Sequence, residues 1–204
     1  MITIVDYGVG NIRAFTNIYK QLNIPIKIAK NVADLVNVSK IILPGVGAFD
    51  YAMETLEQSG MRGRLVELVE QEKIPVIGIC VGMQMMALSS DEGKLPGLGW
   101  IDGSVKKFDV LKIKQKTQLP HMGWNDVNPI KTNTLFNGLE KDSRFYFLHS
   151  YYFQCNNSED NIAVANYGDQ FTCAINKENV YGVQFHPEKS HEYGIQLLKN
   201  FAIL

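Results

Sequence analysis

The sequence is poor in cysteine and carries no excess of charge. Its 204 residues include three widely spaced cysteines, Cys80, Cys155 and Cys173. An odd number at such spacing suits no disulfide framework and favours a reducing, cytoplasmic location. No Cys-x-x-Cys motif or cluster of histidine and cysteine is present, so we predict no bound metal. The net charge of −1 argues against a nucleic-acid partner, which would require concentrated positive charge.

Long apolar runs are also missing. The longest uncharged stretch, residues 74–90, is short for a membrane span of about 20 residues and is interrupted by Pro75 and by glycines. The N-terminus, residues 1–6, lacks the basic region of a signal peptide and is typical of a strand. We therefore predict neither a membrane segment nor a secretory signal.

The N-terminal half alternates between strand and helix patterns. Hydrophobic residues make up 46% of the chain and charged residues 20%, as in a globular domain with a full core. Because no linker or repeat marks a boundary, we predict one domain over residues 1–204. Continuously apolar strands alternating with helices predict a parallel sheet covered on both faces. The predicted strands are residues 2–5, 26–29, 40–43 and 76–79. Pro44 and Gly45 are expected to stop the third strand, and a helix is expected to follow the fourth from about residue 83.

After about residue 95 the pattern changes to shorter apolar runs separated by Gly, Asn and Asp turns, which are typical of hairpins. These runs are residues 105–108, 145–148, 162–165, 171–175 and 181–185. A helix carrying Ile195, Leu198 and Phe201 closes the chain. The predicted fold class is therefore α/β. Its central sheet is mostly parallel, is flanked by helices on both faces, and has an antiparallel extension in the C-terminal half.

The pentapeptide Gly78-Ile79-Cys80-Val81-Gly82 has the form of a nucleophile elbow, with Cys in place of Ser. Such an elbow needs a strand before it and a helix after it, and flanking glycines let the backbone pass closely. The helix N-terminus would also stabilise a thiolate at Cys80. The alternative is a buried structural cysteine, since free cysteines often pack as small apolar side chains. We interpret Cys155 and Cys173 in that structural way.

A base and its orienting carboxylate are predicted at His186-Pro187-Glu188, which follows an apolar run. Residues two apart in an extended segment project to the same face, so Glu188 can reach the imidazole of His186. The carboxylate would hold one ring nitrogen and leave the other for the thiol. Three other histidines, His121, His149 and His191, compete for the role of base, and His121 falls in a segment typical of a loop. His149 is the strongest rival, but none has a carboxylate at a comparable fixed offset.

Donors for an oxyanion are predicted at two places. One is the backbone N–H of Val81, directly after the nucleophile. The other is the glycine-rich turn at residues 44–47, where Val46 and Gly47 could turn a peptide plane into the site. The turn Gly8-Val9-Gly10 fails as a dinucleotide fingerprint because Arg13 stands where a third small residue belongs. We therefore predict no cofactor.

Together, residues 78–84 and 184–190 resemble the class I (triad-type) glutamine amidotransferases. The likeness covers nearly the full length and includes the segments at residues 6–11, 44–47 and 120–125. It implies a flavodoxin-like amidotransferase fold. It also implies that Cys80 attacks the side-chain amide of glutamine, that His186 oriented by Glu188 transfers the protons, and that a glutamyl thioester forms and is hydrolysed. The residues matching the glutamine site of the family are Gly47, Gln84, Glu92, Ser150 and Tyr151.

The chain is most similar to the branch of this family whose members pass ammonia to a separate (β/α)8-barrel cyclase in histidine synthesis. This resemblance implies a heterodimer whose partner holds the phosphorylated nucleotide precursor. Positions near the partner interface of the family match Asn11, His121, Trp124 and Asn125.

Three alternatives remain from the sequence. Residues 99–103 and the ending around residues 189–191 look similar to a paralogous branch, which supplies ammonia for an acetamidino sugar of surface polysaccharide. A cysteine peptidase or related hydrolase on the same kind of fold would show a similar elbow and base. A non-catalytic binding subunit is disfavoured because Cys80, His186 and Glu188 are all intact.

Overall fold

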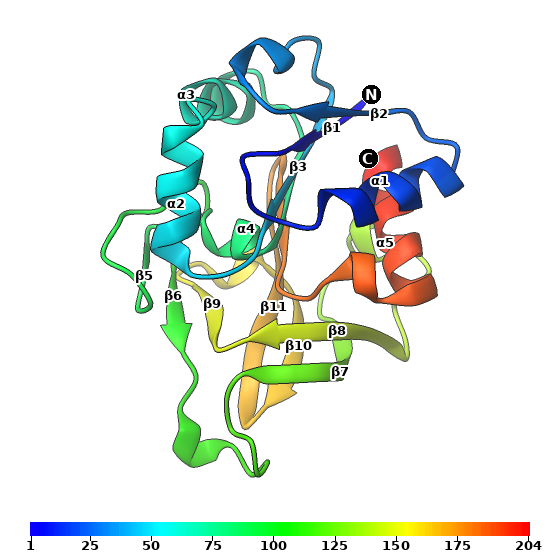
Figure 1. Cartoon of the computed structure of the whole chain (residues 1–204). Helices are drawn as coiled ribbons and strands as arrows, with labels where there is room; N and C mark the ends of the chain where they lie inside the picture. The colour runs from blue at the N-terminus through cyan, green and yellow to red at the C-terminus, as the bar shows by residue number, and fades with distance from the viewer.

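The apolar runs of the N-terminal half form neighbouring parallel strands in the computed structural model, which describes residues 1–204. A fifth parallel strand from the C-terminal half lies beside the strand that carries Cys80 (Figure 1). In spatial order the parallel strands are β2 (Ile26–Ala29), β1 (Ile2–Val5), β3 (Lys40–Gly45), β4 (Val76–Cys80) and β12 (Val180–Val183).

The sheet continues beyond β12 with antiparallel strands, as the hairpin pattern predicts. These are β11 (Asp169–Lys177), β10 (Asn161–Tyr167), β7 (His121–Pro129) and β8 (Ser143–His149). A branch leaves this path where β9 pairs with both β11 and β6. The branch consists of β9 (Tyr151–Cys155), β6 (Gly103–Lys107) and β5 (Ser89–Ser90).

Helices cover both faces of the parallel region (Figure 1). On one face lie α1 (Ile12–Gln21) and α5 (His191–Ile203), joined by a 3.0 Å hydrogen bond from the Tyr19 hydroxyl to the Leu198 carbonyl. On the other face lie α2 (Phe49–Gln58) and α3 (Arg62–Val66). The remaining helical turns are η1 (Val32–Asp34), η2 (Glu67–Gln71), α4 (Val81–Gln84), η3 (Val110–Lys112), η4 (Thr134–Phe136), η5 (Ser158–Asp160) and η6 (Pro187–Lys189). None of these helices combines the length and the apolar character that a bilayer crossing requires.

The predicted fold class is confirmed, but three local predictions were wrong. The segment 120–125 is not a loop, because β7 begins at residue 121 and pairs in register with β8. Strand β3 continues through Pro44, where it still pairs with β4. Pro44 is tolerated because the pairing of β3 with β1 has already ended at Ile42, so the missing N–H interrupts no ladder to β1. The helix after Cys80 is the single turn α4, which begins at Val81, where the sequence predicts a helix from about residue 83.

One continuous cluster of buried apolar side chains runs through both halves of the chain. It includes Ile4 and Phe49 from the parallel region and Phe147 and Phe171 from the antiparallel region. The antiparallel strands are therefore packed on the same core as the strands that carry the elbow.

Candidate active site

The elbow at Cys80 is held by close backbone packing between β3, β4 and α4. Cys80 has φ of 55° and ψ of −113°, which is a strained conformation for a residue with a side chain. A Cβ on Gly82 would overlap the carbonyl oxygen of Leu43, and one on Gly78 would lie 2.6 Å from the Gly82 carbonyl. Glycine is therefore required at both positions, and the strain at Cys80 projects its sulfur out of the turn.

His186 follows β12 and forms a buried pair with Glu188. Its Nδ1 lies 2.9 Å from Glu188 Oε1, and the two side chains are only 3% and 2% exposed. The second carboxylate oxygen is buried without a protein donor, so His186 is the group that balances the charge of Glu188. Two hydrogen bonds fix the backbone of His186. Its N–H donates to the Tyr146 carbonyl at 2.8 Å, and its carbonyl accepts from the Ser190 hydroxyl at 2.6 Å.

This environment favours the imidazolium form of His186. Burial works to lower the pKa of His186, but the adjacent Cys80 and Glu188 outweigh it and raise that pKa to about 10. Because Nδ1 faces the carboxylate, Nε2 is the nitrogen left for the thiol. Cys80 and His186 can therefore form a thiolate–imidazolium pair, in which the nucleophile needs no further deprotonation.

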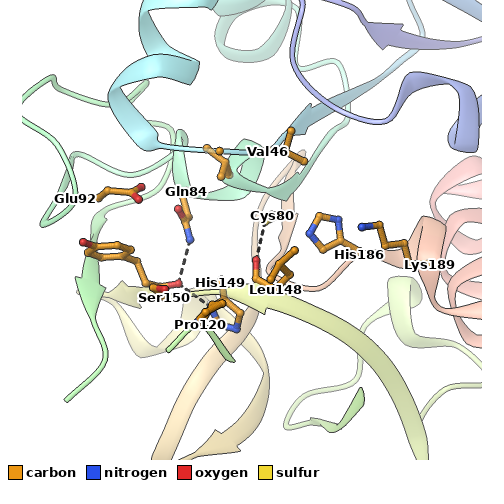
Figure 2. Close-up of a pocket in the computed structure, with 13 residues that line it drawn as sticks. Val46, Cys80, Gln84, Glu92, Pro120, Leu148, His149, Ser150, His186 and Lys189 are labelled. Carbon is orange, nitrogen blue, oxygen red and sulfur yellow. Dashed lines mark hydrogen bonds between the residues drawn. The ribbon is translucent and has the colours of Figure 1, made fainter. Parts of the chain in front are cut away.

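A cavity of about 320 Å³ is lined by Cys80 and His186 (Figure 2). All the predicted catalytic, oxyanion and substrate residues lie in its wall except Glu188, which stands behind His186. The lining residues are Val46, Gly47, Cys80, Val81, Gln84, Glu92, Pro120, Leu148, His149, Ser150, Tyr151, His186 and Lys189. Pro120, Leu148, His149 and Lys189 are members of this wall that the sequence did not assign to the site.

Gln84 and Glu92 lie on the side of the cavity away from His186 (Figure 2). The Gln84 amide nitrogen donates to the Tyr151 carbonyl at 3.1 Å. A Glu92 carboxylate oxygen accepts the backbone N–H of Phe49 at 2.9 Å, where α2 begins. Gly47 has φ of 90°, a conformation that glycine adopts without strain, and nothing lies within 4 Å of the position its Cβ would take.

The thiol of Cys80 has two further polar neighbours that the sequence analysis did not find. It donates to the Leu148 carbonyl at a sulfur–oxygen distance of 3.9 Å, and its sulfur accepts from the Gln184 amide at 3.7 Å. A signal for Gln184 was available, since it stands two residues before His186 and extended residues two apart share a face. No sequence signal points to a backbone carbonyl such as that of Leu148.

His149, the strongest rival base, lies in the cavity wall but has no nitrogen free to take the thiol proton. Its Nδ1 lies 2.7 Å from the Tyr151 carbonyl, and its Nε2 lies 2.9 Å from Nδ1 of His121. Burial lowers the pKa of His149 to about 3, helped by the neighbouring His121, and burial lowers the pKa of His121 to about 4. Both rings are therefore neutral, in contrast to His186.

The residues predicted at a partner interface divide into two groups. Asn11 and Trp124 are exposed, and Asn125 is partly exposed. His121, however, is only 4% exposed, so a direct contact with a partner is closed to its side chain. Its burial follows from the alternation of β7, which turns residue 121 inward and residues 122 and 124 outward.

An apolar surface lies on the outer face of the β7–β8 hairpin. Met122, Trp124 and Leu148 are 62%, 40% and 38% exposed. The Trp124 ring stacks on His191 with centroids 5.2 Å apart and meets the edge of Tyr146 at 6.3 Å. Exposed apolar groups gathered in one place are typical of a docking surface.

Comparison with known proteins gives consistent matches over the full chain. Residues 3–204 match the family described as Glutamine amidotransferase class-I. The chain is 59% identical over 202 residues to the imidazole glycerol phosphate synthase subunit HisH of Bdellovibrio bacteriovorus, with 99% of each chain covered. It is 53% identical to HisH of Leptospira interrogans and 46% identical to the protein named HisH 2 of Pseudomonas aeruginosa, with 100% of each chain covered.

Solved structures agree on the fold. A structure titled "Crystal structure of glutamine amidotransferase" superposes with a TM-score of 0.76 at 17% identity, covering 100% of this chain and 99% of that one. The structure of PurLQS from Thermotoga maritima gives a TM-score of 0.73 at 16% identity, covering 98% of this chain and 96% of that one. At these identities the likeness establishes the architecture alone.

Proposed function

Because the chain belongs to the class I glutamine amidotransferases, we propose that it is the glutaminase subunit of an imidazole glycerol phosphate synthase. It hydrolyses glutamine to glutamate and ammonia and passes the ammonia to a cyclase partner. The observation that carries the proposal is the convergence of Cys80, His186 and the matched glutamine-binding residues on one cavity. Likeness to HisH subunits over the full chain supports the choice of pathway.

The chemistry is acyl transfer through Cys80. The thiolate attacks the carboxamide carbon of glutamine, and the N–H groups of Val81 and of the Val46–Gly47 peptide stabilise the oxyanion that develops. His186 gives its proton to the leaving nitrogen, so ammonia departs and a glutamyl thioester remains. A water molecule then loses a proton to His186 and attacks the thioester. Glutamate leaves, and the thiolate–imidazolium pair is restored.

Substrate recognition follows from the charges in the wall. Glu92 is the one acidic side chain that lines the cavity, and it suits the ammonium group of glutamine. Gly47, Gln84, Ser150 and Tyr151 supply backbone and amide groups around the rest of the substrate. The carboxamide is thereby directed toward Cys80, on the other side of the cavity from Glu92.

The partner is a (β/α)8-barrel cyclase that forms a heterodimer with this chain. It docks on the surface carrying Trp124, Asn11 and Asn125, and His121 acts from behind that surface rather than within it. The exposed apolar groups of the β7–β8 hairpin support this location. We also propose that residues 1–204 form a single glutamine amidotransferase domain working in the cytoplasm, and the continuous apolar core supports the single domain.

The test is glutamate release from glutamine, measured for the chain alone, with the histidine-pathway cyclase of the same organism, and with that cyclase plus its nucleotide ligand. Strong stimulation by the liganded cyclase is expected. Glutamate release without cleavage of peptides separates this function from that of a cysteine peptidase. Absence of glutamate release from well-folded protein in every arm would overturn the proposal.

A second candidate is the paralogous glutaminase that supplies ammonia for an acetamidino sugar. The observation that favours it is the likeness of residues 99–103 and of the ending around residues 189–191 to that branch of the family. In that case the histidine-pathway cyclase would leave glutamate release at its background rate, whereas the barrel partner of the sugar pathway would stimulate it. The same assay with both barrels therefore distinguishes the two candidates.

A further inference from the structure

Gln184 is a buried amide in direct contact with the proposed nucleophile. Its side chain is fully inaccessible to solvent, and its Nε2 lies 3.7 Å from the sulfur of Cys80. It does not line the cavity, so it has no access to substrate. A donor aimed at sulfur favours the thiolate, whereas the Leu148 carbonyl, which accepts the thiol proton at 3.9 Å, favours the neutral thiol.

A single backbone carbonyl fixes the orientation of this amide. The Tyr151 carbonyl can only accept, so the Gln84 nitrogen must face it, at 3.1 Å. Gln84 Nε2 also donates to the Gln184 oxygen, at 2.9 Å. With its oxygen engaged in this way, Gln184 turns its nitrogen toward Cys80.

The same carbonyl receives a second donor from the His121–His149 pair. His149 Nδ1–H donates to the Tyr151 carbonyl at 2.7 Å, which leaves Nε2 of His149 as the acceptor for Nδ1–H of His121 at 2.9 Å. His121 Nε2 in turn accepts from the Asn125 amide at 3.2 Å. While both rings are neutral, every hydrogen bond of this chain has one allowed direction.

We propose that Gln184 is a catalytic residue whose N–H donates to the Cys80 thiolate, and that Gln84, Tyr151 and His149 position it for this task. The proposal rests on the proposed glutaminase function and deepens it. Gln184 and His186 then approach the sulfur as two donors, one neutral and one charged. His149 is a positioning residue, because it reaches the sulfur only through Tyr151, Gln84 and Gln184.

The direct test replaces Gln184 with methionine, which keeps the length of the side chain and removes the donor. The pH profile for alkylation of Cys80 by iodoacetamide is followed by mass spectrometry of the Cys80 peptide. We expect the Gln184→Met variant to move the midpoint of this profile upward by about one pH unit, a tenfold loss of thiolate stabilisation. The kcat for glutamate release should fall about tenfold, in proportion to the lost stabilisation of the thiolate.

Asn200 provides a matched control, because its buried amide donates to the Leu135 and Asn137 carbonyls on another side of the core. Asn200→Leu should lower the melting temperature and leave the alkylation profile unchanged. A folded Gln184→Met protein with the wild-type alkylation profile would overturn the proposal.

The positioning role is tested with two variants of His149. Asparagine places an N–H close to the position of Nδ1 of His149. Leucine fills more of the volume of the imidazole than asparagine does, but it offers no donor. The proposal predicts that His149→Asn keeps the alkylation profile closer to wild type than His149→Leu does. The opposite order would show that His149 acts by packing alone and would remove it from the proposal. Alkylation needs no glutamine, so these outcomes are read independently of glutamate release, which reports on the proposed function.

Discussion

Two buried pairs in this molecule, one of histidine with glutamate and one of two histidines, are held in opposite charge states. His186 lies against Glu188, and the pKa of its imidazole is raised to about 10. His149 lies against His121, and the pKa of its imidazole is lowered to about 3. Both His149 and His186 line the same cavity, and the charge favoured on His186 contributes to keeping His149 neutral.

The difference lies in the hydrogen-bond partners rather than in the depth of burial. A carboxylate and a thiolate compensate a charged imidazole, so His186 keeps its proton despite desolvation. A backbone carbonyl and a second imidazole give no net negative charge, so His121 and His149 are neutral. The charged pair can do chemistry, and the neutral pair can hold hydrogen-bond donors in fixed directions.

The largest effect is expected on removing the nucleophile that the charged pair serves. Cys80→Ala should lower kcat for glutamate release by at least about 10⁴-fold. The melting temperature should stay close to that of the wild type, because alanine meets the same backbone strain at φ of 55°. Steady-state kinetics and a thermal melt check both statements. Full activity in the variant would exclude thioester chemistry at Cys80.

The second largest effect is expected from neutralising the carboxylate of Glu188. Glu188→Gln preserves the shape of the side chain but removes the charge that balances His186, so kcat should fall on the order of 10³-fold. The imidazole proton of His186 should also be released at a lower pH, which an NMR titration of the histidine rings would detect. Unchanged titration of His186 would show that Glu188 does not hold its charge.

The elbow that presents Cys80 to the charged pair should be intolerant of a single methyl group. Gly82→Ala would place a Cβ against the Leu43 carbonyl, and we expect a loss of about 3 kcal/mol in the free energy of unfolding. Gly63→Ala is the control, because nothing lies within 4 Å of its Cβ position in α3. That change should be neutral or stabilising by about 0.5–1 kcal/mol in urea unfolding. Equal stabilities would refute the packing argument.

The neutral pair should weaken the fold in acid. Below pH 6.5 the unfolded chain protonates His121 and His149, whereas the folded protein resists this until pH values of about 4 and 3. The unfolded state thus binds more protons, and stability is lost as pH falls through this window. Between pH 6.5 and 4.5 we expect these two residues to account for a loss of about 2 kcal/mol or more in urea unfolding.

His149→Asn should flatten this acid dependence, because it removes one titrating group and retains a donor. His191→Asn is the matched control, since His191 is exposed on the surface beside Trp124. If both variants kept the full acid dependence, the neutral state of the pair would not be its cause.

The smallest effect is expected outside the cavity. Trp124→Ala removes the largest exposed ring of the β7–β8 surface. Stimulation of glutamate release by the liganded cyclase should fall about tenfold, as for an interface residue that contributes more than about 1 kcal/mol. Release by the chain alone should not change. Wild-type stimulation in a folded Trp124→Ala protein would move the docking surface elsewhere.

The charged pair could be predicted from the sequence, and the neutral pair could not. His186 and Glu188 are two residues apart, and Cys80 sits in a pentapeptide whose glycines are required by the backbone. His121 and His149 are brought together only by the register of β7 on β8. The strand β7 itself was missed, because Pro120 directly before it and Gly123 within it are typical of loops.

The parallel strands could be predicted because, like the His186–Glu188 pair, they depend on residues close together in the sequence. Continuous apolar runs such as residues 76–79 are local signals, and the fold class follows from their alternation with helices. The branch formed by β9, β6 and β5 depends on pairing between distant segments, which one sequence does not encode in a readable pattern. The contact from Gln184 to Cys80 likewise spans the two halves of the chain.

Covalent labelling of the folded protein with a diazoketone analogue of glutamine would show whether Cys80 is the nucleophile of a glutamine site. The label is located by mass spectrometry, with and without excess glutamine. We expect one adduct, on Cys80, that glutamine suppresses and that Cys80→Ala abolishes. Labelling that spreads equally to Cys155, or that glutamine does not reduce, would contradict a glutamine site built around Cys80.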